Sequence, residues 1–159
     1  MNIALFAYAH PLGQHGRYGA ARAIWYLAHG LVQRGHQVTI FAVPGCTVPG
    51  CRYVVMPPIW SDTTDLYRQA LLKDEAETGQ RYDVVHSYMA SGLLDPAWAE
   101  DHRYYHEAFF RASEVARAKF GPKLVSHSKL TQRLNGNQGQ VVYYGVPDPG
   151  PATAALGHE

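Results

Sequence analysis

The chain has 159 residues, of which 47% are hydrophobic and 17% are charged. This length and composition fit one globular domain with a real core, and they exclude a disordered or fibrous protein. A formal net charge of +1 gives no electrostatic basis for binding nucleic acid, and no apolar run is long enough for a membrane helix. The first residues also lack a signal-peptide pattern, so we expect a cytoplasmic protein with free thiols at Cys46 and Cys51.

The first forty-odd residues predict a strand, a glycine-bearing loop, a helix and a second strand. Residues 2–8 are a short apolar run, which is typical of a strand buried on both faces. The helix is predicted from an apolar stripe at helical spacing, and Gly35 marks its end. That stripe consists of Ile24, Leu27, Ala28 and Leu31. Residues 38–43 form the next strand, so the loop lies at the carboxyl end of a strand, where open α/β sheets bind ligands.

This loop carries Gly13, Gly16 and Gly19 and leads directly into the helix. Glycine lets the backbone approach a ligand closely, and a helix start offers free N–H groups, so an anionic group such as phosphate is the natural ligand. The spacing is neither the G-x-G-x-x-G dinucleotide fingerprint nor a P-loop. The glycines taken alone are equally consistent with simple turn formation.

The middle of the chain predicts a strand at 52–56, then a helix capped by Ser61 or Asp62 and ending at Gly79. Its inward residues are expected to be Leu66, Ala70 and Leu71. A buried strand at residues 84–85 then leads into His86, Ser87 and Tyr88. These three would stand beside the glycine loop if the two strands are neighbours.

The last third predicts a helix over 105–116, a strand at 123–126, a brief helix and a final strand at 141–144. Ser126 or Ser128 would cap the brief helix, which carries Leu130 and Leu134. We therefore predict one Rossmann-like three-layer α/β/α domain over residues 1–146, with about six mostly parallel strands. Residues 147–159 are rich in Pro, Gly and Ala and are expected to be a linker or tail.

With these elements placed, the chain resembles the N-terminal domain of family-4 glycosyltransferases, which use nucleotide-sugars, retain anomeric configuration and have the GT-B fold. Four stretches in the family's order carry the resemblance, and they cover nearly the whole chain. They are NIALFAY with the glycine loop and AIWYLAHGLVQRGHQVTIFA, then YDVVHSYMASGLL, KLVSHSKLTQRL and VVYYGVPDP. They resemble the family's opening, its D-V-V-H-x-H segment, its V-S strand and helix, and its V-I-P-N-G-V-D turn.

The resemblance implies roles for individual residues. Gly19 matches the second glycine of the family's G-G loop, whose backbone approaches the donor diphosphate, with Gly16 opening that loop and Ala20 following it. His86 matches the first histidine of D-V-V-H-x-H. Tyr88 stands where the family's second histidine reaches the sugar, and because a tyrosine accepts no proton near neutral pH, His10 is a candidate for that role.

Three further departures from the family are visible. Its V-V-x-T-x-H strand is replaced, on this interpretation, by the loop and helix of residues 93–120, and Tyr144 replaces the asparagine of N-G-V-D. The family's second domain, which grips the nucleotide-sugar, is also missing. The resemblance thus implies the acceptor-side half of a hexosyltransferase, which needs a missing C-terminal donor-binding domain or subunit and is inactive alone. Its ligands would be a nucleotide-sugar donor and a sugar or other small-molecule acceptor, with no metal and no further cofactor.

Two alternatives remain open at this stage. The chain could be a non-catalytic binding or interaction module derived from the same fold, or a generic nucleotide-binding protein. A separate possibility concerns His102 and His106, whose i, i+4 spacing would put them on one face of a helix and can hold a metal. The order of residues around them is not that of a zinc protease, and we favour two polar-face histidines.

Overall fold

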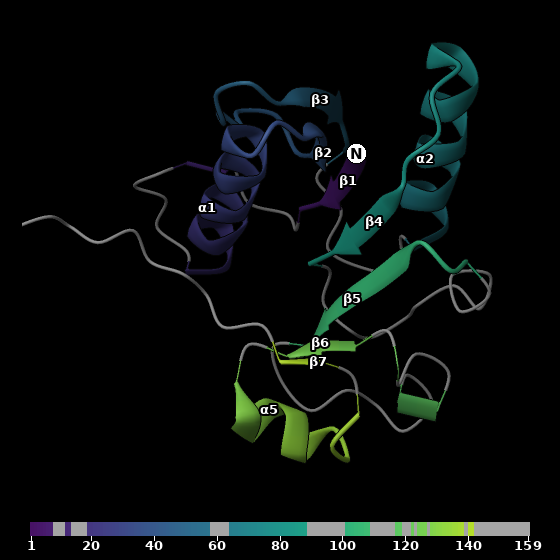
Figure 1. Ribbon diagram of the computed structural model, residues 1–159. Helices are drawn as coiled ribbons and strands as arrows, with labels where there is room; N and C mark the ends of the chain where they lie inside the picture. Colours follow the sequence, from purple (N-terminus) through teal and green to yellow (C-terminus); the bar gives the residue numbers. More distant parts are fainter. Residues whose placement is uncertain are drawn as a thin grey trace, which may run out of the picture.

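The computed structural model describes residues 1–7, 12–13, 19–57, 64–88, 101–108, 117–118, 122, 124–126, 128–138 and 140–141. Within these ranges seven strands form one sheet in the order β3-β2-β1-β4-β5-β6-β7 (Figure 1). Neighbouring strands are parallel in all six pairings that connect them. The prediction of a mostly parallel α/β sheet is confirmed.

The helices and strands follow the predicted order, with one exception treated below. The strands are β1 (Asn2–Phe6), β2 (Gln37–Ala42), β3 (Arg52–Val55), β4 (Val84–Ser87), β5 (Tyr104–Ala108), β6 (Leu124–Ser126) and β7 (Gln140–Val141). The described helices are α1 (Gly19–Gln33), α2 (Thr64–Thr78) and α5 (Lys129–Leu134). Two helices stop as predicted, because Gly35 and Gly79 adopt positive φ angles of 79° and 65° just past their ends.

The centre of the sheet is β1, which pairs with β2 on one side and β4 on the other. The chain runs outward from β1 to β3, then returns to β4 and runs outward again to β7. The order of strands therefore reverses between β1 and β4. In open parallel sheets this switch point leaves a crevice at the carboxyl ends of the two strands, and ligands bind there.

The sheet is covered on both faces, as the apolar run of β1 predicts. Alternate residues of β1 belong to two separate buried clusters. Ile3 and Leu5 pack with α1, whereas Ala4 and Phe6 pack with Tyr67 and other residues of α2. Because side chains along a strand point to opposite faces in turn, α1 and α2 lie on opposite sides of the sheet. This arrangement is the predicted three-layer domain (Figure 1).

The prediction of a helix over 105–116 is wrong for its first residues, because Tyr104–Ala108 is strand β5. β5 pairs with β4 on one side and β6 on the other, and Tyr104 is only 1% exposed in the α2-side core. The aromatic residues are spaced as in a helix, but hydrogen bonding to β4 and β6 on both sides makes this segment a strand. Residues 109–116 lie outside the described ranges.

This correction removes two further expectations. In the family, the V-V-x-T-x-H strand lies between the segments that correspond here to β4 and β6. β5 occupies this place, so the prediction that a loop and helix replace the strand is wrong there. His106 lies in β5 and His102 in the turn before it. The two histidines therefore do not share a helix face, and the basis for a metal pair is gone.

Smaller differences concern which helix faces are buried. In α2, Tyr67 and Leu71 are 5% and 1% exposed. Leu66 was predicted to face inward, but it is 42% exposed. Leu130 and Leu134 lie in α5, as predicted, and both are exposed. The cap of α5 is Ser128, whose Oγ accepts a hydrogen bond from the Thr131 N–H at 3.1 Å. Of the two serines predicted as caps, Ser128 is thus the one.

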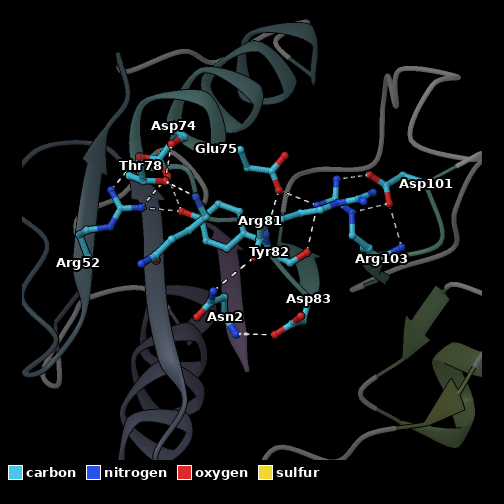
Figure 2. A network of polar contacts seen from close by, with 11 residues as sticks. Asn2, Arg52, Asp74, Glu75, Thr78, Arg81, Tyr82, Asp83, Asp101 and Arg103 are labelled. Atoms are coloured by element: carbon cyan, nitrogen blue, oxygen red, sulfur yellow. Dashed lines mark hydrogen bonds and ion pairs between the residues drawn. The ribbon is translucent and has the colours of Figure 1, made fainter.

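The amino edge of the sheet is held by charged side chains that attach α2 to the strands (Figure 2). The Arg52 guanidinium, at the start of β3, donates hydrogen bonds to both carboxylate oxygens of Asp74 and to the Tyr82 hydroxyl. The Tyr82 hydroxyl in turn donates to Asp74 at 2.6 Å. The hydrogen bond from Arg52 holds the pKa of Asp74 below its usual value. The pKa of Tyr82 is raised to about 12, mainly because the hydroxyl is buried.

A second arginine, Arg103, occupies the same edge just before β5 (Figure 2). Its guanidinium makes a bidentate contact with Asp101 at 3.0 and 2.8 Å, and it donates to Glu75 of α2 at 2.6 Å and to the Tyr82 carbonyl at 3.0 Å. The arginine side chain is 8% exposed. These contacts fix the C-terminal half of α2 at the edge opposite the switch-point crevice, so they belong to stability and not to the candidate site.

Candidate functional site

The candidate site lies at the carboxyl ends of β1 and β4. The last register pair joins Phe6 to Ser87, and just beyond it the Tyr88 N–H donates to the Phe6 carbonyl at 3.0 Å. On the other side of β1 the Ala7 N–H donates to the Phe41 carbonyl at 3.0 Å. These two hydrogen bonds extend the backbone pairing on each side of β1 just beyond the last register pairs. The predicted proximity of the two strand ends is confirmed.

His86 and Tyr88 are brought together by the alternation of side chains along β4. Their rings stack with centroids 4.8 Å apart and planes inclined by 21°. Tyr88 is 3% exposed and packs in the α1-side core, whereas His86 is half-buried. The imidazole therefore rests on a fixed aromatic wall. The intervening Ser87 faces the other core, where it is hydrogen-bonded to the Tyr104 hydroxyl.

Gly19 and Ala20 are the first two residues of α1. α1 connects the carboxyl end of β1 to the amino end of the parallel strand β2, so its first turn lies at the carboxyl edge, on the face that carries His86 and Tyr88. A Cβ atom added to Gly19 would meet nothing within 4 Å, so the space beside this residue is open. The first turn contains no acidic residue, which leaves its N–H groups and positive dipole end suited to an anion.

The structure thus brings four of the six candidate residues to one edge and one face of the sheet, namely Gly19, Ala20, His86 and Tyr88. Gly16 and His10 lie outside the described residues, and so do His15, Tyr144 and the 147–159 tail. Their predicted roles stay predictions.

Sequence reasoning missed a contact between the start of the glycine loop and the cysteine loop that follows β2. Leu12 is 2% exposed, and its N–H donates to the Cys46 Sγ at 3.3 Å. The Thr47 N–H donates back to the Leu12 carbonyl at 3.1 Å. The sequence offered one indication of this contact. The segment PGCTVPGC follows the carboxyl end of β2, which is adjacent to β1, so both loops begin at the same edge of the sheet.

Ser126 ends β6 at the same carboxyl edge and is fully buried. Its Oγ has no hydrogen-bond partner in the described part of the chain. Among those residues no three or more His, Cys, Asp or Glu side chains gather as a metal would require. Cys46 and Cys51 are free thiols. No described helix has the length and apolar character needed to cross a membrane.

Comparison with solved structures places this architecture among known proteins. A glycosyltransferase from Rickettsia africae ESF-5 matches over 91% of this chain with a TM-score of 0.60 and 18% identity. The fold is glycosyltransferase-like. AviGT4, a glycosyltransferase involved in avilamycin A biosynthesis, matches over 88% of the chain with a TM-score of 0.54 and 17% identity. The chain spans 43% and 41% of the length of these two proteins.

The likeness to these structures is one of fold, because both identities are low. No protein-family profile matches the chain, and no curated protein sequence matches it. The glycosyltransferase-like domain found here therefore corresponds to less than half of each of the two enzymes. What either enzyme acts on is not transferred to this chain by the match.

Proposed function

We propose that this chain is the N-terminal, acceptor-side domain of a GT-B glycosyltransferase that takes its sugar from a nucleotide-sugar. The observation that carries the proposal is the carboxyl edge at the β1–β4 switch point. There the open start of α1 and the His86–Tyr88 pair lie on the same face of a glycosyltransferase-like fold.

The donor diphosphate is assigned to the start of α1, along Gly16, Gly19 and Ala20. The absence of a side chain at Gly19 lets phosphate oxygens approach the backbone N–H groups, and the helix dipole favours the negative charge. When a sugar is transferred, the departing diphosphate gains charge, and N–H groups placed there would stabilise it in the transition state. This assignment requires no metal ion.

His86 is assigned to the reacting sugar and acceptor. Its ring is half-buried near the end of β4 and its Nε2 atom is fully covered, so this assignment is supported by the resemblance and by the place of His86 at the carboxyl edge. Tyr88 lies almost wholly in the core, so we assign it the role of a wall that fixes the orientation of the imidazole through ring stacking. His10 is the further candidate on the glycine loop, on the strength of the resemblance alone.

A second Rossmann-like domain is part of the proposal, because a GT-B reaction takes place in a cleft between two domains. It would bind the nucleotide and sugar and close over the edge described above. The proposal is supported by the share of the two solved glycosyltransferases that this chain spans, 43% and 41% of their lengths. On this proposal the domain is supplied either in the same polypeptide or by a partner subunit.

The test is a transfer assay on this chain joined to, or co-expressed with, the domain encoded beside it. A panel of nucleotide-sugars is screened for release of nucleoside diphosphate. Gly19→Val should reduce turnover at least tenfold, since the side chain would occupy the space reserved for phosphate. Gly30→Val is the matched control, because Gly30 also lies in α1 and a Cβ there also meets nothing within 4 Å.

Two results would count against the proposal. One is equal turnover by the wild-type and Gly19→Val proteins. The other is an equal loss in the Gly19→Val and Gly30→Val proteins, because the effect would then belong to helix stability.

The second candidate function is a non-catalytic binding module built on the same fold. It is favoured by Tyr88, which stands where the resemblance calls for a histidine and which the core almost fully buries. In that case nucleoside diphosphate would bind the assembled protein and Gly19→Val would weaken binding, yet no nucleotide-sugar would be consumed.

A further inference from the structure

One short segment, Cys46–Thr47, is hydrogen-bonded both to the start of the glycine loop and to α1, the helix that follows the loop. At the start of the loop, the Leu12 N–H donates to the Cys46 Sγ at 3.3 Å, and the Leu12 carbonyl accepts a hydrogen bond from the Thr47 N–H at 3.1 Å. α1 is hydrogen-bonded to the same segment, since the Trp25 Nε1–H donates to the Thr47 carbonyl at 2.7 Å. Leu12, Trp25 and Val48 are all 7% exposed or less.

The Cys46 thiol is what links this segment back to the sheet. It accepts from Leu12 and donates its own hydrogen to the Val43 carbonyl at 3.2 Å. Val43 directly follows β2, whose residues 37–41 pair with β1. Burial raises the pKa of the Cys46 thiol, so the sulfur keeps its proton at neutral pH and can donate and accept at once.

We propose that Cys46 is a positioning residue for the donor site, because its thiol sets where the glycine loop begins relative to α1. Only the link between Cys46 and donor binding rests on the proposed function. The anchor itself, from Val43 through Cys46 to Leu12, is a property of the fold. Leu12 and α1 are hydrogen-bonded to the same segment, so the start of the loop and the helix that follows it share one support, and fixing this support before a ligand arrives would reduce the ordering required on binding.

The chain contains its own control in Cys51. Both cysteines are half-buried and both pack against the α1-side core. Burial raises the pKa of Cys51 to about 11, so its thiol is protonated as well. In the described part of the chain, however, none of the hydrogen bonds involves the Cys51 sulfur. The two residues thus share chemistry and environment and differ in the anchor.

The first experiment measures hydrogen exchange at individual amides by NMR and needs no ligand. Cys46→Ala should accelerate exchange of the Leu12 N–H at least tenfold. The N–H of Gln37, which donates to the Met1 carbonyl at the far edge, should be unchanged. Cys46→Ser should restore part of the protection, because a hydroxyl donates and accepts but forms shorter bonds than sulfur. Cys51→Ala should leave Leu12 protected. Equal exchange in the wild-type and Cys46→Ala proteins, or equal acceleration in both alanine variants, would overturn the anchor.

The second experiment tests the effect on the donor site in the assembled two-domain protein. Cys46→Ala should raise the KM for the nucleotide-sugar about tenfold with a smaller change in kcat, whereas Cys51→Ala should change neither. A donor KM equal to that of wild type, despite faster exchange at Leu12, would refute the positioning role and leave the anchor. If the wild-type protein uses no nucleotide-sugar, the proposed function fails, and the exchange result still decides whether the anchor exists.

Discussion

Replacing Arg103 with methionine is the sharpest test of how the sheet is held at its amino edge. The guanidinium of Arg103 donates four hydrogen bonds, to Asp101, Glu75 and the Tyr82 carbonyl. Methionine keeps the apolar part of the side chain and removes all four. The variant removes the charged partner of two carboxylates and one donor to a carbonyl, although each carboxylate keeps a hydrogen bond from a backbone N–H, Glu75 from Tyr82 and Asp101 from residue 103.

The magnitude follows from burial. Removing one partner of a fully buried ion pair costs about 3–5 kcal/mol, since the other charge is left in a poor solvent. The Glu75 and Asp101 side chains are 15% and 20% exposed, so water can reach them in part. We therefore expect a loss of about 2–4 kcal/mol. For a chain of this size that corresponds to a drop in Tm of roughly 5–15 °C.

Urea unfolding followed by circular dichroism gives the free energy of unfolding directly. The matched control is Arg133→Met, because Arg133 is exposed in the last turn of α5. That variant should lose less than about 1 kcal/mol. Arg103→Lys should fall between Arg103→Met and wild type, because an ammonium group cannot make the bidentate contact with Asp101. If Arg103→Met unfolds within 0.5 kcal/mol of the control, roughly the scatter of surface substitutions, the amino-edge network does not hold α2 to the sheet.

Two further predictions concern pH and backbone strain. Because the hydrogen bond from Arg52 lowers the folded-state pKa of Asp74, this carboxylate stabilises the fold above its unfolded pKa of about 4, and the contribution is lost as pH falls through the folded value. The stability gap between wild type and Asp74→Asn, from urea midpoints between pH 2.5 and 7, should therefore narrow below about pH 4, and a constant gap would contradict this. Gly50→Ala should cost about 1–3 kcal/mol, because Gly50 has a φ of 80° and its new Cβ would lie 2.6 Å from the Val32 Cγ1. Gly30→Ala, in open space within α1, should instead be neutral or stabilising by up to about 1 kcal/mol in the same unfolding assay.

The sequence by itself determined the elements whose signals are local. The strand–helix–strand unit at the N-terminus was readable because an apolar run, a helical stripe and Gly35 all agree within a few dozen residues. His86 and Tyr88 were placed at a strand end for the same reason, since Val84 and Val85 precede them directly. Such features depend on neighbours in the chain, which a sequence pattern records.

The tertiary structure decided what depends on partners far away in the chain. Tyr104–Ala108 is a strand because β4 and β6 hydrogen-bond to both of its edges, although its aromatic spacing resembles that of a helix. The contact between Leu12 and Cys46 spans 34 positions and leaves no periodic signal. The placement of α1's first turn on the same edge and face as the His86–Tyr88 pair likewise follows from the order β2-β1-β4. Hydrogen bonding and burial between distant segments outweigh local preference at these places, and only the folded chain brings those segments together.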